Sequence, residues 1–198
     1  MRKIAIIGRC YSTRSDAPWE DPSWELWTLA WDPVPVTHRI FETHKNFRMY
    51  LGSKEEGDFH VSGLRMSKVP VYMLERHDDI PMSVKYPMGL IGDLIGKTRE
   101  GYPYLESSIA YMMALAIWES EPGDRIAIFG VDLHCDSEYA FQRPNMEYLI
   151  GLARGKGIKV YIPPQSALCT HQMGVPYGFY SSTDAGAPQT PLPQGKAA

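Results

Sequence analysis

The sequence predicts an α/β fold, a single Rossmann-like domain in which a mostly parallel sheet is flanked by helices. Residues 3–7 and 125–131 are short, nearly continuous apolar runs, which are typical of strands buried on both faces of a parallel sheet. Between them, residues 104–119 carry apolar side chains at helical spacing. With 198 residues, 44% of them apolar, the chain is long enough for one sizeable core.

The amino-terminal half of the chain alternates between strands and polar loops. The run Lys-Ile-Ala-Ile-Ile at residues 3–7 stops at Gly8, and a loop containing Ser, Asp, Pro and Trp follows at residues 9–23. Further segments with strand character are residues 24–29, 38–41 and 69–74. Because Pro70 cannot donate to a ladder, we expect the last strand to begin there or to lie at a sheet edge.

The segments between these strands give weaker signals. Residues 44–51 are compatible with a short helix, and we expect a polar loop at residues 55–63. Residues 83–97 are ambiguous, with helical spacing only in their second half.

The clearest element of the carboxyl-terminal half is a helix over residues 104–119. One face of it collects apolar side chains at a spacing of about 3.6 residues: Ile109, Met112, Met113, Ala116 and Ile117. After the stop at Pro122-Gly123 we expect a strand at residues 125–131, a helix at about 143–155 and a strand at 158–162. This succession of helix and strand is typical of crossovers in a parallel sheet.

Composition bounds the classes of partner. We expect the domain to span residues 1–180 and residues 181–198 to form a flexible tail, because that tail has almost no apolar bulk. The formal net charge of −3 does not favour double-stranded DNA as a partner. The three cysteines form no Cys-x-x-Cys pair, and no stretch approaches the roughly eighteen apolar residues of a membrane span. These features predict a cytoplasmic protein that binds no membrane.

Ligands of parallel α/β sheets bind beyond the carboxyl ends of the strands, so polar residues at those ends are candidates for a site. The first candidate is the loop after the first strand, where Gly8 permits a tight turn and Arg9 and Ser12 could meet an anion. Cys10 lies between them. A plain surface turn is the alternative interpretation of this loop.

Two more candidates lie further along the chain. Ser107 and Ser108, at the front of the central helix, can either cap its free N–H groups or face a ligand. Asp132 closes an apolar strand, where it could face a ligand or hold a neighbouring loop through backbone N–H groups. His134 and Tyr139 follow, and His134 has a side chain suited to proton exchange, although a surface position would equally account for it.

The remaining features are less specific. Arg143 opens a helix and could line the same cleft or be a solvated helix start. The early tryptophans fit the packing of a core corner better than a platform for a base or sugar: Trp19, Trp24, Trp27 and Trp31. The histidines form no His-x-x-x-His pair, so we expect no metal site. The absence of a Gly-x-Ser-x-Gly elbow and of a P-loop argues against serine hydrolases and P-loop kinases.

Three blocks of the sequence resemble small bacterial sialyltransferases. They are residues 107–117, the run Arg-Ile-Ala-Ile-Phe-Gly-Val-Asp at 125–132, and Tyr-Ala-Phe at 139–141. This resemblance implies a Rossmann-like, GT-A-type domain that uses CMP-sialic acid without a metal. The chain is more loosely similar to archaeal-type 6-hydroxymethylpterin pyrophosphokinases and related motility-accessory proteins. It also resembles a family of tailed-phage proteins in which the run at residues 139–155 recurs.

The sialyltransferase resemblance implies roles for particular residues. It assigns the loop from Gly8 to Ser12 to the nucleotide, Ser108 to the donor, and His134 and Tyr139 to the phosphate, where they would stabilise the leaving group. The family's Gly-Asn-Gly-Pro-Ser loop is Gly-Arg-Cys-Tyr-Ser here. The asparagine that ends the family's second strand aligns near Ala30, so the identity of the base stays open.

Three functions are compatible with these observations, and the sequence leaves open whether the protein is an enzyme. The first is a metal-independent, glycosyltransferase-like enzyme that takes a CMP-sugar or another nucleotide sugar and needs no further cofactor. The second is a non-catalytic phage protein that binds or sequesters a nucleotide in the host cytoplasm. The sialyltransferases carry a lid with a histidine base downstream of the strand that ends in Asp, whereas this chain has only His171 in a remotely comparable place, and this difference favours the second function. The third is Mg²⁺-dependent pyrophosphoryl transfer using Asp132 and Asp136. A homodimer is compatible with each of them.

Overall fold

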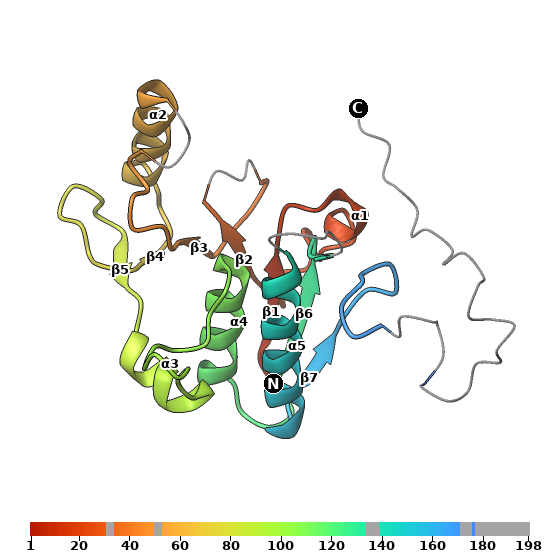
Figure 1. Ribbon diagram of the computed structural model, residues 1–198. Helices are drawn as coiled ribbons and strands as arrows, with labels where there is room; N and C mark the ends of the chain where they lie inside the picture. The colour runs from red at the N-terminus through yellow and green to blue at the C-terminus, as the bar shows by residue number, and fades with distance from the viewer. Residues whose placement is uncertain (31–33, 50–52, 134–138, 171–175, 177–198) are drawn as a thin grey trace, which may run out of the picture.

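The computed structural model describes residues 1–30, 34–49, 53–133, 139–170 and 176. Seven strands form one sheet in the order β5-β4-β3-β2-β1-β6-β7, and every neighbouring pair is parallel (Figure 1). The strands are β1 (Lys3–Ile7), β2 (Glu25–Leu29), β3 (Arg39–Glu42), β4 (Val71–Met73), β5 (Ser83–Lys85), β6 (Arg125–Phe129) and β7 (Lys159–Tyr161). The predicted single α/β, Rossmann-like domain is confirmed.

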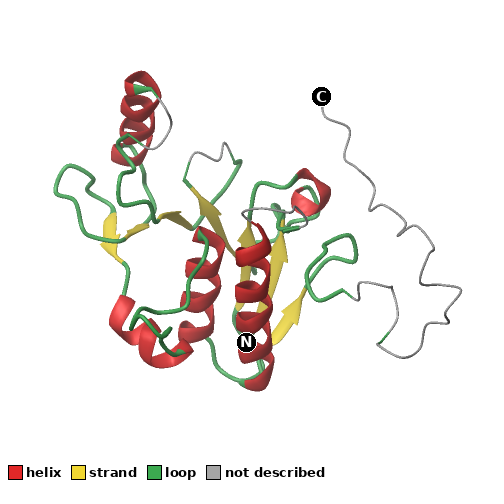
Figure 2. Cartoon of the chain, in the orientation of Figure 1, coloured by secondary structure: helices red, strands yellow, loops and turns green. Residues whose placement is uncertain are grey.

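One face of the sheet is covered by two long helices. These two are α4 (Ser108–Glu119) and α5 (Tyr139–Gly155), and the other helices of the described residues are α1 (Tyr11–Arg14), α2 (Lys54–Arg65) and α3 (Met88–Ile95). Figure 2 shows α4 and α5 side by side along this face, and α4 also contacts α3. Isoleucines of the interior strands β1 and β6 belong to the same core cluster as the buried residues of α4. Because α4 meets the sheet and a helix on either side, it is apolar over most of its circumference, and eight of its twelve residues are buried.

The opposite face is covered mainly by loops and by α2. Leu26 and Phe129 of the sheet cluster there with Ala17, and Trp19 and Trp24 pack against them. On the α4 face, Trp27 is fully buried and stacks on Phe41 with ring centroids 5.5 Å apart. Trp19, Trp24 and Trp27 pack against the core as predicted, but they do not share one corner of it, because Trp27 lies on the other face of the sheet. Trp31 lies outside the described residues.

An ion-pair network ties the end of α4 to the amino-terminal edge of the sheet. Glu119, the last residue of α4, pairs with Arg39 of β3 at 2.6 Å and with Arg2 at 2.8 Å. Arg2 also pairs with Glu25 of β2 at 2.6 Å. Since the carboxyl end of α4 is held at this edge, its amino end lies at the opposite edge, beyond the carboxyl ends of the strands.

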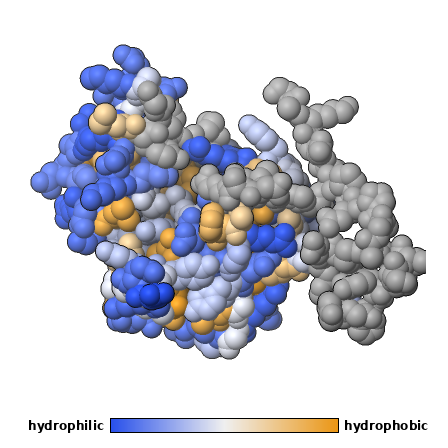
Figure 3. Space-filling view, viewed as in Figure 1, coloured by the Kyte–Doolittle hydropathy of each residue, from blue (hydrophilic) through white to orange (hydrophobic). Residues whose placement is uncertain are grey.

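The polar loop predicted at residues 55–63 is wrong, because this segment lies in α2. The oxygen of Ser53 caps the helix by accepting from the N–H of Glu56 at 3.1 Å. The buried residues have the helical spacing i, i+3, i+4, i+7: Gly57, His60, Val61 and Leu64. Glycine and histidine occupy two of these positions, so the apolar pattern was incomplete. Figure 3 shows a mainly hydrophilic surface over α2.

Other boundaries also differ from the predictions. Residues 45–49 form turns instead of the start of a short helix, the ambiguous segment 83–97 begins with β5, and α1 lies inside the predicted first loop. The helix predicted from residue 104 begins at Ser108, because Ser107 caps it. No helix among the described residues has the length and apolar character needed to span a membrane.

Candidate functional site

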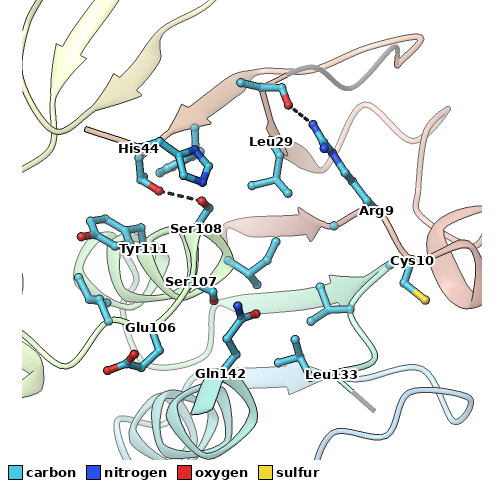
Figure 4. Close-up of a pocket in the computed structure, with 18 of the residues that line it drawn as sticks. Arg9, Cys10, Leu29, His44, Glu106, Ser107, Ser108, Tyr111, Leu133 and Gln142 are labelled. Carbon is cyan, nitrogen blue, oxygen red and sulfur yellow. Dashed lines mark hydrogen bonds between the residues drawn. The ribbon is translucent and has the colours of Figure 1, made fainter. Parts of the chain in front are cut away.

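The candidate site lies at the carboxyl ends of β1 and its neighbours β2 and β6, where the order of the strands along the sheet changes direction. From β1 the chain proceeds outward strand by strand to β5, and it then returns to place β6 against the other edge of β1. Such a switch point leaves a crevice beyond the carboxyl ends of the two strands. A cavity of about 780 Å³ opens there, within the range of small-molecule sites. We call it the switch-point cavity (Figure 4).

Two glycines in backbone contact form one part of the cavity wall. A Cβ atom at Gly8, after β1, would lie 2.4 Å from the carbonyl oxygen of Gly130, after β6. A Cβ atom at Gly130 would lie 2.6 Å from the carbonyl oxygen of Gly8, and Gly130 has a φ of +63°. The N–H of Gly130 donates to the buried Thr13 hydroxyl at 2.7 Å. A side chain at either position would force the backbone to shift, so the wall here is bare backbone.

The amino terminus of α4 forms the opposite part of the wall. Ser107 caps the helix by accepting from the N–H of Ala110 at 3.1 Å, and Ser108 and Thr43 share a hydrogen bond of 2.7 Å between their hydroxyls. Figure 4 shows both serines at the cavity. The first amides of a helix have no carbonyl partner within it and carry its positive dipole end, which suits an anion.

The segment leading into α4 is held by a buried side chain of α5. The side-chain oxygen of Asn145 accepts from the N–H of Glu106 at 3.0 Å, and its amide donates to the carbonyl of Tyr104 at 2.7 Å. Asn145 is fully buried, so both bonds form away from water. Glu106, which lines the cavity, therefore has a fixed backbone.

Cys10 and Asp132 meet at the glycine side of the cavity. The Cys10 thiol donates to Oδ2 of Asp132 at 2.8 Å. Burial raises the pKa of the Cys10 thiol, and the hydrogen bond to Asp132 raises it further, so the thiol is a neutral donor. Among the described residues, Oδ1 of Asp132 is buried without a hydrogen-bond partner. A buried oxygen left without a partner costs about 1–3 kcal/mol.

Arg9 supplies a positive charge next to this wall. Its guanidinium donates to the carbonyl of Ala30 at 2.6 Å, which draws the side chain from the end of β1 toward the end of β2 (Figure 4). Carboxylates of Glu42, Glu106 and Asp132 line the same cavity. The cavity thus offers acceptors for hydroxyl or amino groups as well as donors for an anion.

Glu42, the last residue of β3, joins two histidines. Its Oε1 lies 2.6 Å from Nδ1 of His44, and its Oε2 lies 2.6 Å from Nε2 of His60 in α2. The backbone N–H of His44 also donates to Oε1, at 2.9 Å. Burial by itself raises the pKa of Glu42, but the hydrogen bonds from His44 and His60 outweigh it and lower the pKa to about 2. Glu42 is therefore an ionised carboxylate that is only 3% exposed.

The structure brings most of the sequence-predicted site residues together. Those that line the switch-point cavity are Gly8, Arg9, Cys10, Ser107, Ser108 and Asp132. Ser12 lies in α1 with its hydroxyl 3.4 Å from the Cys10 sulfur, and Arg143 pairs with Glu147 at 2.9 Å; neither lines the cavity. His134, Asp136 and His171 lie outside the described residues, and Tyr139 begins α5 with a side chain that is not described.

Sequence reasoning missed several lining residues. They are Glu42, Thr43, His44, Tyr111 and Gln142, whereas Glu106 directly precedes the two serines identified at the front of the central helix. The first three directly follow the segment predicted as the third strand, so the rule that sites lie at strand ends could have identified them. Assigning residues 44–51 to a helix concealed this signal.

Outside the undescribed segments, no three His, Cys, Asp or Glu side chains converge as metal ligands do. No protein-family model, curated protein or solved structure gave a significant match to this chain.

Proposed function

We propose that this protein binds a nucleotide sugar in the switch-point cavity and transfers the sugar to an acceptor as a metal-independent glycosyltransferase. The observation that carries the proposal is the convergence of the bare Gly8–Gly130 wall and the amino terminus of α4 on one cavity at the switch point. Bare backbone allows a phosphate or ribose to approach closely, and the helix terminus favours a negative charge. The sequence resemblance to sialyltransferases supports the choice of a nucleotide sugar.

Each part of the cavity has a role in this proposal. The diphosphate or monophosphate lies toward Ser107 and Ser108, where helix amides and hydroxyls stabilise the charge that develops on the leaving nucleotide. Asp132, which lines the cavity, accepts from a hydroxyl or amino group of the ligand through its carboxylate. Arg9 adds a positive charge on the wall of the same cavity.

Binding is tested by a thermal-shift screen of the full chain. The ligands are CMP, UMP, GMP, AMP, their diphosphates, CMP-sialic acid and UDP-sugars, each with and without Mg²⁺. A ligand at 100 times its Kd stabilises the folded state by about 2.7 kcal/mol, which raises Tm by roughly 5–10 °C for a chain of this size. A selective shift that does not need Mg²⁺ supports the proposal, and the absence of any shift contradicts it.

Two variants locate the ligand. Asp132→Ala, which removes both carboxylate oxygens, should lower the affinity at least tenfold. Asp93→Ala, an exposed change on α3 away from the cavity, is the matched control and should not alter the affinity. Chromatography of the reaction mixture then separates transfer from sequestration, because only transfer or hydrolysis releases the nucleotide. A bound nucleotide sugar returned intact would contradict the transferase part of the proposal.

A further inference from the structure

We infer that His44 is the general base of the switch-point cavity and that Glu42 is the residue that positions it. This inference rests on the proposed glycosyl transfer and names the group that activates the acceptor. Neither residue has a role in the function as argued so far, because the sequence indicated a base only at His134.

The first step of the argument is the tautomer of His44. An ionised carboxylate can only accept hydrogen bonds, so the 2.6 Å contact requires the proton on Nδ1 of His44. In the neutral ring the lone pair is then on Nε2. Glu42 also accepts from the backbone N–H of the same residue, which fixes the ring relative to its own main chain. His44 is therefore held in the tautomer that a general base needs.

The second step is that Glu42 itself is held in place. His60 of α2 donates to the other carboxylate oxygen at 2.6 Å, and both side chains are at most 3% exposed. A buried carboxylate bound on both sides cannot turn away from His44. It also stabilises the imidazolium that forms when His44 takes a proton, because opposite charges interact strongly where water is excluded.

The third step is the location. The His44 side chain is 38% exposed and lines the switch-point cavity, whereas Glu42 and His60 are buried. Figure 4 shows its ring on the cavity side, near Ser108 and Leu29. The ring thus lies in the same cavity as the amino terminus of α4, where the leaving phosphate is proposed to bind.

The chemical step balances without a further reactant. The hydroxyl oxygen of the acceptor, or of water, attacks the anomeric carbon and forms the new C–O bond. The bond from that carbon to the phosphate oxygen breaks, and its electron pair leaves with the nucleotide. The hydroxyl proton passes to Nε2 of His44. One displacement of this kind inverts the anomeric centre.

The first experiment measures the tautomer directly. Nitrogen-15 NMR of the full chain, with His44→Gln to assign the resonance, should show Nδ1 protonated and Nε2 unprotonated in the neutral ring. A proton on Nε2 instead would overturn the inference, whatever substrate the protein uses.

The second experiment measures hydrolysis of CMP-sialic acid by the full chain, with water as the acceptor. His44→Gln should lower kcat by about 10²–10⁴-fold while the thermal shift with CMP is unchanged. Imidazole added to His44→Ala should restore part of the rate, which a structural role would not produce. His77→Gln, a histidine that does not line the cavity, is the control.

The pH profile gives a further distinction. His44→Gln should depend on pH differently from the parent, because the group that takes the proton from the acceptor is gone. Glu42 faces His44 directly, His60 faces it through Glu42, and the other titratable groups lining the cavity are Arg9, Cys10, Glu106, Tyr111 and Asp132. If His44→Gln is active with the parent's pH profile, the inference is overturned and the proposed function still stands. A parent that neither binds CMP nor hydrolyses the donor overturns the proposed function and the inference with it.

Discussion

Adding a methyl group at Gly130 should destabilise the protein by two separable effects. A left-handed φ costs a residue with a Cβ atom about 1–2 kcal/mol, and Gly130 has a φ of +63°. The new Cβ would also lie 2.6 Å from the carbonyl oxygen of Gly8, and overpacking of this kind costs about 1–3 kcal/mol. We therefore expect Gly130→Ala to lower the free energy of unfolding by about 2–5 kcal/mol.

Three other glycines separate these effects. Gly8→Ala creates a contact of 2.4 Å without a left-handed φ, and Gly101→Ala at a φ of +86° meets no atom within 4 Å. Gly151→Ala, in α5, has neither problem and should be neutral or stabilising by up to about 1 kcal/mol. We expect Gly8→Ala to cost about 1–3 kcal/mol and Gly101→Ala about 1–2 kcal/mol, the latter partly offset by the lower entropy of the unfolded chain.

The assay is urea unfolding followed by tryptophan fluorescence. The order of midpoints should be Gly151→Ala highest, then the parent, then Gly8→Ala and Gly101→Ala, and Gly130→Ala lowest. A Gly130→Ala protein as stable as Gly101→Ala would refute the reasoning, because it would mean that the two strand ends do not touch. The same result would remove the bare backbone wall from the proposed site.

Two further predictions concern buried polar groups. The pKa of Glu42, lowered from 4.5 to about 2, implies stability that is present above about pH 5 and is lost as the pH falls toward 2. Carboxyl carbon-13 NMR should therefore show Glu42 still ionised at pH 3, and a midpoint near 4.5 would contradict the contacts with His44 and His60. Asn145→Ala would leave the N–H of Glu106 and the carbonyl of Tyr104 unpaired, and should cost about 2–4 kcal/mol in urea unfolding. The exposed change Asn46→Ala is its control and should cost less than about 0.5 kcal/mol.

Much of the fold was predictable because its signals are local. The runs at residues 3–7 and 125–131 are apolar on both faces, since β1 and β6 are interior strands of a sheet that is covered on both sides. The helix α4 was predictable from its apolar pattern and its serine cap. By contrast, α2 was not predicted, because its buried face includes Gly57 and His60. A Cβ atom at Gly57 would clash with the carbonyl oxygen of Arg48, and His60 is buried with its hydrogen bond to Glu42.

The candidate site was predictable where strand ends met polar residues. Gly8, Cys10 and Asp132 were identified separately, and their contact across 122 positions of sequence is a tertiary fact. The pairing of Glu42 with His60 was likewise not predictable, because no pattern near a buried helical histidine shows which residue it will bind.

By itself, the sequence determined the fold class, the central helix and the strand ends that line the cavity, because apolar periodicity and capping depend on residues close in the chain. Only the tertiary structure decided that Gly8 and Gly130 touch, that Asp132 keeps an oxygen without a partner, and that a buried glutamate orients His44. These contacts join segments that are far apart in sequence, and their geometry follows from the order of the strands, which no local pattern encodes.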